Sequence, residues 1–178
     1  DCMRLNMWMI ANCLEVLEPE LYLKDYEPAV IKGVRLYSAD GYAYVCQKDS
    51  KVMCSFGEEY FLLSGLSLEV AFGLIQDVFD VFDAWENKVK RWMQHMEYQK
   101  IVDSCHAFLR NPLVLLDANY KVMALSRQYG PDDVDGEWKY LKENGFSSIK
   151  VVKELRARSA DSNLQRIRHP DAVLRLKL

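Results

Sequence analysis

The side chains that could do chemistry in this chain are few, and their spacing does not favour it. His95 and His106 lie eleven residues apart, and Cys105 is the one thiol adjacent to either of them. Neighbouring residues on a helix point about 100° apart, so Cys105 and His106 cannot share a metal ion there. We therefore expect solvated or interfacial histidines and no metal site.

The acidic run Asp132–Gly136 resembles part of a calcium-binding loop, but the ligands required at the first and last positions of such a loop are absent. Such a loop needs oxygen ligands at its first and twelfth positions, where this chain has Pro131 and Lys142. These acids are better explained as helix caps. With three histidines and eight glycines, no Ser–His–Asp set, phosphate-cradling loop or carboxylate pair can be assembled. We expect no catalytic residues and no cofactor, hence no enzyme.

The five cysteines are odd in number and form no C-x-x-C pair, which is typical of a reducing cytoplasm. Cys46 and Cys54 fall on neighbouring predicted strands. They are either two core thiols or a redox pair, and the sequence favours core thiols.

Composition excludes several classes of protein. The chain has 178 residues, 50% of them hydrophobic and 28% charged, as in an ordinary globular protein of one domain or two small ones. With a net charge of −3, the chain lacks the excess of positive charge that is typical of DNA-binding domains. No apolar run is long enough for a membrane span, and Asn6, Asn12 and Glu15 interrupt any signal-peptide core. We expect a cytoplasmic protein with no membrane partner.

The first predicted domain, residues 1–66, is a small antiparallel sheet preceded by an amphipathic helix over Met3–Val16. A short strand is expected within Leu21–Tyr26. Four β-prone runs then follow: Ile31–Tyr37, Tyr42–Gln47, Lys51–Phe56 and Tyr60–Leu63. Asp40-Gly41 separates the first two runs and predicts a tight hairpin there.

A single long helix is predicted for residues 67–111, because Ser67 can cap its start and Ser67–Arg110 contains no proline. It would be about 65 Å long at the usual rise. Apolar residues recur along it at spacings of three and four: Leu68, Ala71, Ile75, Val78, Phe82, Trp85, Val89, Trp92 and Met96. Since neither small domain could cover so long a seam, we predict a homodimer held by this coiled-coil-like helix. Gln99 interrupts the seam.

The second predicted domain, residues 112–178, begins with two strands, Leu113–Asp117 and Tyr120–Ser126. Two short helices follow, and Val173–Leu178 alternates like a last strand. So few strands make an incomplete sheet, which indicates a truncated domain. Tyr120, Trp138 and Phe146 are candidates to line a pocket for a flat, ring-bearing effector, with core packing as the alternative.

Two ordered segments carry a family resemblance. Phe72–Glu86 in the long helix is followed by Asn111–Ser126, which fits N-P-[apolar]-D-x-x-[aromatic]-x-V-[apolar]-A-x-S. This arrangement resembles the sensory half of bacterial PucR-type (purine catabolism regulator-like) transcriptional regulators. The resemblance implies an N-terminal α/β domain, a long helix and a PAS- or GAF-like sensor, followed in the family by a helix-turn-helix domain that this chain lacks. It implies no ligand-contact residues.

The sequence thus predicts an α+β, two-domain, dimeric sensor region of a cytoplasmic regulator. Contact with DNA is expected only through the domain missing from this chain. The alternative is a protein–protein scaffold without a small-molecule ligand. An exposed apolar patch on the second domain would favour the scaffold, and an enclosed apolar pocket would favour the sensor.

Overall fold

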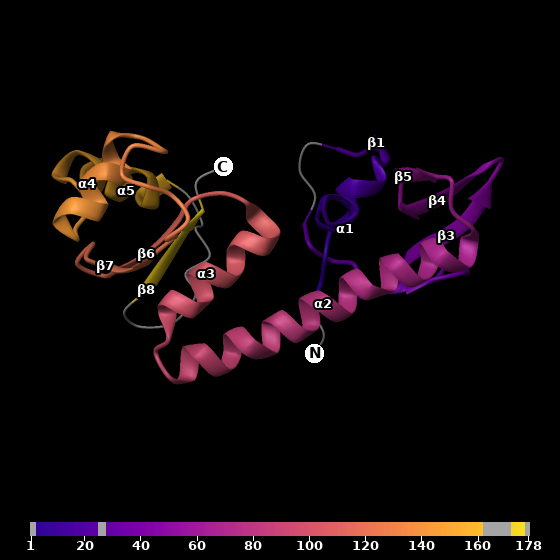
Figure 1. Ribbon diagram of the computed structural model, residues 1–178, viewed down its shortest axis with the longest axis horizontal. Coiled ribbons are helices and arrows are strands. Elements are labelled where there is room, and N and C mark those ends of the chain that lie inside the picture. The colour runs from indigo at the N-terminus through magenta and orange to yellow at the C-terminus, as the bar shows by residue number, and fades with distance from the viewer. Residues whose placement is uncertain (1–2, 25–27, 162–171, 177–178) are drawn as a thin grey trace. The chain divides into compact units, whose positions relative to one another are not determined.

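A computed structural model describes residues 3–24, 28–161 and 172–176 of the chain (Figure 1). The fold class is α+β, as the sequence predicts. The chain divides into two compact units, Asp1–Val89 and Lys90–Leu178. Each unit is described separately below.

The described part of the first unit contains a five-stranded sheet with the order β1-β5-β4-β3-β2. Its strands are β1 (Glu20–Tyr22), β2 (Val34–Arg35), β3 (Ala43–Lys48), β4 (Lys51–Phe56) and β5 (Glu59–Ser64). Val45, Cys54 and Phe61 stand side by side on three neighbouring strands and are fully buried. Because side chains alternate along a strand, one face of this sheet is core and the other is more exposed.

The predicted hairpin at Asp40-Gly41 is wrong, because β2 runs parallel to β3 and makes the sheet mixed. Asp40-Gly41 does form a turn, in which Gly41 has φ +78° and the N–H of Tyr42 donates to the carbonyl of Ala39. That turn leads from a loop into β3 instead of joining two antiparallel strands. The sequence located the turn correctly but not the direction of the strand before it.

Two helices bury apolar side chains in the first unit. Helix α1 (Met7–Cys13) is capped by Asn6, whose side chain accepts from the N–H of Met9, and a 3-10 turn, η1 (Glu15–Leu17), follows. Helix α2 (Leu68–Gln94) is capped by Ser67, whose hydroxyl accepts from the N–H of Val70 at 3.3 Å. The predicted cap is therefore present.

The predicted single helix over 67–111 is wrong: the chain forms two helices, α2 and α3 (Tyr98–Leu109). Between them Met96 has φ +55°, in the left-handed region. The N–H of Glu97 donates to the carbonyl of Trp92 at 2.9 Å, and the N–H of Met96 donates to that of Met93 at 3.2 Å. This pair of bonds is a Schellman motif, which ends a helix by satisfying its last carbonyl groups.

The described part of the second unit contains a three-stranded antiparallel sheet in the order β7-β6-β8. The strands are β6 (Leu113–Asp117), β7 (Val122–Leu125) and β8 (Ala172–Leu176), which confirms the three predicted strands; residues 177 and 178 lie outside the described residues. Helices α4 (Gly136–Asn144) and α5 (Ile149–Asp161) separate β7 from β8. Asp135 caps α4 by accepting from the N–H of Trp138 at 2.8 Å.

Candidate functional site

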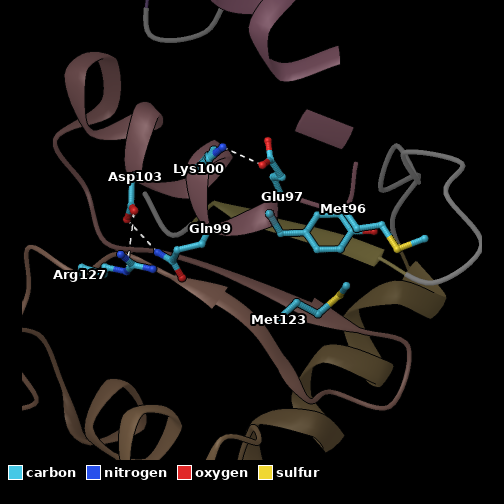
Figure 2. Close-up of a pocket in the computed structure, with 8 residues that line it drawn as sticks. Met96, Glu97, Gln99, Lys100, Asp103, Met123 and Arg127 are labelled. Carbon is cyan, nitrogen blue, oxygen red and sulfur yellow. Dashed lines mark hydrogen bonds and ion pairs between the residues drawn. The ribbon is translucent and has the colours of Figure 1, made fainter. Parts of the chain in front are cut away.

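A cleft of about 400 Å³ lies in the second unit, where the chain turns from α2 into α3 (Figure 2). It is partly open to solvent. Its lining comes from this turn, the first turns of α3 and β7 with the residues after it: Met96, Glu97, Tyr98, Gln99, Lys100, Asp103, Met123 and Arg127. The left-handed residue that ends α2 is therefore part of the cleft wall.

The Gln99 amide fixes α3 against the sheet. Its Nε2 donates to the carbonyl of Leu125 and to Asp103 Oδ1, both at 2.8 Å, and its Oε1 accepts from the N–H of Leu125 at 3.4 Å. Gln99 thus pairs with both backbone groups of one β7 residue, as a neighbouring strand would. This contact explains why a polar residue interrupts the apolar pattern at that position.

Charged side chains surround the cleft in two pairs. Arg127 Nε lies 3.8 Å from Asp103 Oδ2, and Lys100 Nζ donates to Glu97 Oε1 at 2.7 Å (Figure 2). The side chains of Met96 and Met123 supply apolar lining. The cleft offers apolar, donor and acceptor groups, but it is partly open and largely charged, so it is not the enclosed apolar pocket that the sequence analysis named as the mark of a sensor.

Two of the three residues predicted to line a pocket are neighbours at the backbone level. Tyr120 lies in the turn between β6 and β7 with φ +63°, and its carbonyl accepts from the N–H of Ser147. Phe146 forms an isolated bridge with Lys121, and about half of its surface is exposed. The guanidinium of Arg156 stands 5.5 Å from the centre of the Tyr120 ring.

The third, Trp138, is buried in a different environment. Its indole N–H donates to the carbonyl of Gly130 at 3.0 Å, and its ring packs edge-on against Tyr129. Tyr129 in turn packs edge-on against His106, whose Nδ1 is buried without a hydrogen-bond partner among the described residues. Trp138 belongs to this aromatic cluster, as the alternative of core packing anticipated, and it does not line the cleft.

The predicted dimer seam divides into two parts. Ala71, Ile75, Val78 and Phe82 are buried within the single chain. Since their surface is already covered, a second copy is not needed to bury them. The first unit supplies the cover that the sequence analysis assigned to a partner.

The other seam residues remain at least partly accessible. Leu68, Trp85, Val89 and Trp92 are half-buried. Met96 is 70% exposed and stands outside both helices, so it is not a seam position. A helix–helix contact between copies would therefore use the accessible positions of α2, which include Trp85, Val89 and Trp92 of the predicted seam.

The cysteines do not form the redox pair that was considered. In the sheet Cys46 stands opposite Met53 and Cys54 opposite Val45, so the two thiols lie on opposite faces. Burial raises the pKa of Cys54, and Cys46 raises it further. Burial also raises the pKa of Cys105 to about 11, which makes both buried thiols poor nucleophiles at neutral pH.

The described residues contain no group of three or more histidine, cysteine, aspartate or glutamate side chains that could hold a metal ion. None of their helices is both long enough and apolar enough to cross a membrane.

The cleft was not among the predicted features, although one of its residues stands out in the sequence. Gln99 was identified as the interruption of the apolar seam, and this was the usable signal. The other lining residues look like ordinary surface positions in sequence. They come together because the helix ends at Met96, which the sequence analysis did not predict.

Comparison with protein families, with curated proteins and with solved structures gives no match for this chain.

Proposed function

We propose that this chain is the signal-sensing, dimerising and non-enzymatic region of a bacterial transcriptional regulator, similar to the PucR-type regulators that its sequence resembles. A small effector would occupy the cleft at the start of α3. DNA would be bound by a helix-turn-helix domain encoded elsewhere in the same gene, in the cytoplasm.

The observation that carries the proposal is the position of the cleft. Its wall includes Met96, which ends α2, and Gln99, which joins α3 to β7. An occupant of the cleft would contact both, so it could favour one geometry of this turn over another. A ligand that prefers one of two such states shifts their populations by its difference in affinity, typically about 1–3 kcal/mol.

Two measurements test the proposal. The gene sequence that follows Leu178 is expected to encode a helix-turn-helix domain, and a different class of domain there would contradict the regulator. A thermal-shift screen with a panel of small metabolites is expected to find a compound that stabilises the wild-type chain. Met123→Glu, which places a charge in the apolar lining, should abolish that stabilisation, whereas Met53→Glu in the first unit should not.

The second candidate is a scaffold that binds only proteins. The second unit exposes three apolar side chains on or beside its last helices: Tyr140, Phe146 and Ile149, the last of these 76% exposed. Exposed apolar residues of this kind favour a protein contact. If no compound in the screen binds while Ile149→Glu abolishes recovery of a co-purifying protein, the scaffold is the better explanation.

A further inference from the structure

A second apolar stripe runs along α2 beside the face that is buried in the first unit. Val81 and Val70 are 53% and 51% exposed, and Leu74, Trp85 and Trp92 are half-buried. The positions of this seam alternate at spacings of four and three: Leu74, Val78, Val81, Trp85, Lys88 and Trp92. Val78 is buried within the chain at the edge of the seam, and the other five positions are at least partly accessible. This is the heptad spacing of a helix that packs along another helix.

The charges of α2 are separated along its length. Leu68–Asp83 contains Glu69, Asp77, Asp80 and Asp83 and no basic residue, whereas Asn87–Gln94 contains Lys88, Lys90 and Arg91 and no acid. Two copies side by side in the same direction would place acid near acid and base near base. Two copies in opposite directions would place the acidic half of each beside the basic half of the other.

We propose that α2 pairs with α2 of a second copy in antiparallel orientation, through the seam that begins at Leu74. This inference rests on the dimeric part of the proposed function and adds the face and the direction of the contact. Because α2 is one uninterrupted helix over Leu68–Gln94, the positions along the seam follow from the helix itself. A two-fold axis that passes near Asp83 places the N-terminal half of the seam on one copy beside its C-terminal half on the other copy.

With this axis, each seam residue of one helix lies opposite a seam residue of the other helix, as an antiparallel coiled coil requires. Trp85 packs on Val81 of the partner subunit, and Trp92 packs on Leu74 of the partner subunit. Leu74, Val81, Trp85 and Trp92 thereby each meet an apolar residue of the partner subunit, and the aliphatic stem of Lys88 covers the edge of the seam beside the buried Val78. Sequence spacing and pairing direction therefore agree on one arrangement.

The flanking charges agree with the same arrangement. In an antiparallel coiled coil, each residue at heptad position g directly precedes the seam residue at position a. The g residues of the two helices face one another across the interface. Asp77 and Arg91 hold two such positions, and both side chains are exposed. Asp77 then faces Arg91 of the partner subunit, and the symmetry repeats the pair. The surface is complementary to itself, which argues for a second copy of this chain as the occupant.

Charge reversal at these two positions tests the pairing. Asp77→Arg and Arg91→Asp each replace both attractive pairs with repulsive ones. Each variant alone should weaken the dimer roughly ten- to thirtyfold in sedimentation equilibrium. An equimolar mixture of the two should recover wild-type affinity as a heterodimer, and the double variant Asp77→Arg/Arg91→Asp should recover it as a homodimer.

Asp80→Arg is the matched control, since Asp80 is exposed on α2 but lies more than a quarter-turn from the seam. It should leave the dimer unchanged, and thermal unfolding should show that all variants fold. If the wild type dimerises but the two single variants associate as it does, the antiparallel inference is overturned while the dimeric sensor stands. A monomeric wild type overturns both the pairing and the dimer.

Discussion

At the scale of single residues, the amide of Gln99 explains how α3 is attached to the second unit's sheet. It satisfies both the N–H and the carbonyl of Leu125 on β7, and Asp103 accepts its remaining donor. An amide is the side chain that can donate to a carbonyl and accept from an N–H at once. Leucine has a similar size but can do neither.

Gln99→Leu should lower the free energy of unfolding by about 1–3 kcal/mol, since it leaves partly buried backbone groups of Leu125 without partners. Urea titration followed by circular dichroism measures this change. Gln94→Leu is the control, because Gln94 is exposed and a surface change of this kind stays within about 0.5 kcal/mol. Equal effects of the two substitutions would contradict the assigned contact.

The buried thiol of Cys105 makes stability depend on pH in the alkaline range. Burial raises the pKa of this group from about 9 to about 11, so the folded chain holds the thiol proton more tightly than the unfolded chain. The contribution of this group to stability is complete below about pH 9 and is lost as the pH rises toward 11. Stability should therefore fall across that window.

Other groups also titrate there, so the test is a comparison. Chemical denaturation of wild type and Cys105→Ala at pH 8, 9, 10 and 11 isolates the thiol. The variant is less stable at pH 8, because the substitution leaves a cavity, and its stability should fall less steeply with pH. Parallel pH profiles of the two chains would show that Cys105 is not protected by burial.

At the scale of elements, the end of α2 is the feature that separates the structure from a continuous helix. Met96 takes a left-handed conformation, which costs an L-residue with a side chain roughly 1–2 kcal/mol. Its side chain is 70% exposed and contributes little packing to offset that cost. Glycine adopts this conformation without the penalty.

Met96→Gly is consequently expected to stabilise the chain by about 0.5–1 kcal/mol, measured by thermal and urea unfolding. Asn87→Gly, at an exposed position inside α2, should destabilise it by a few tenths of a kcal/mol. Opposite signs for the two glycines support a helix end at Met96. Destabilisation by both would indicate that the helix continues through residue 96.

Elements specified by local chemistry could be predicted from the sequence, and those specified by tertiary context could not. β3, β4 and β5 lie within two residues of their predicted runs, because alternating apolar residues and two-residue turns fix them locally. The parallel direction of β2 depends on how a loop folds back, which no local pattern records. The end of α2 was missed for a similar reason: Met is a good helix former, and no glycine marks the Schellman turn.

The candidate site was harder to predict than the fold. The aromatic residues chosen from sequence went to different places, with Trp138 in the core and Phe146 half exposed. Aromatic type predicts burial well and a ligand contact poorly. The cleft instead depends on a helix end, on charged residues of α3, and on the strand that Gln99 engages.

At the scale of the whole molecule, α2 has two separate apolar faces. One face, containing Ala71, Ile75 and Phe82, is buried in the first unit. The neighbouring stripe, with Val81 half exposed, has heptad spacing and a self-complementary charge pattern. The homodimer that we propose through this stripe would link the chain to a dimeric regulator.

Sedimentation velocity of the wild type beside Val81→Glu and Phe82→Ala, across the micromolar range, tests this dimer most directly. The wild type should sediment at twice the chain mass. Val81→Glu should give a folded monomer, since it buries a charge only in the dimer, whereas Phe82→Ala should lower the unfolding free energy by about 3–5 kcal/mol. A wild type that stays monomeric, or a Val81→Glu chain that stays dimeric, would contradict dimerisation through this face.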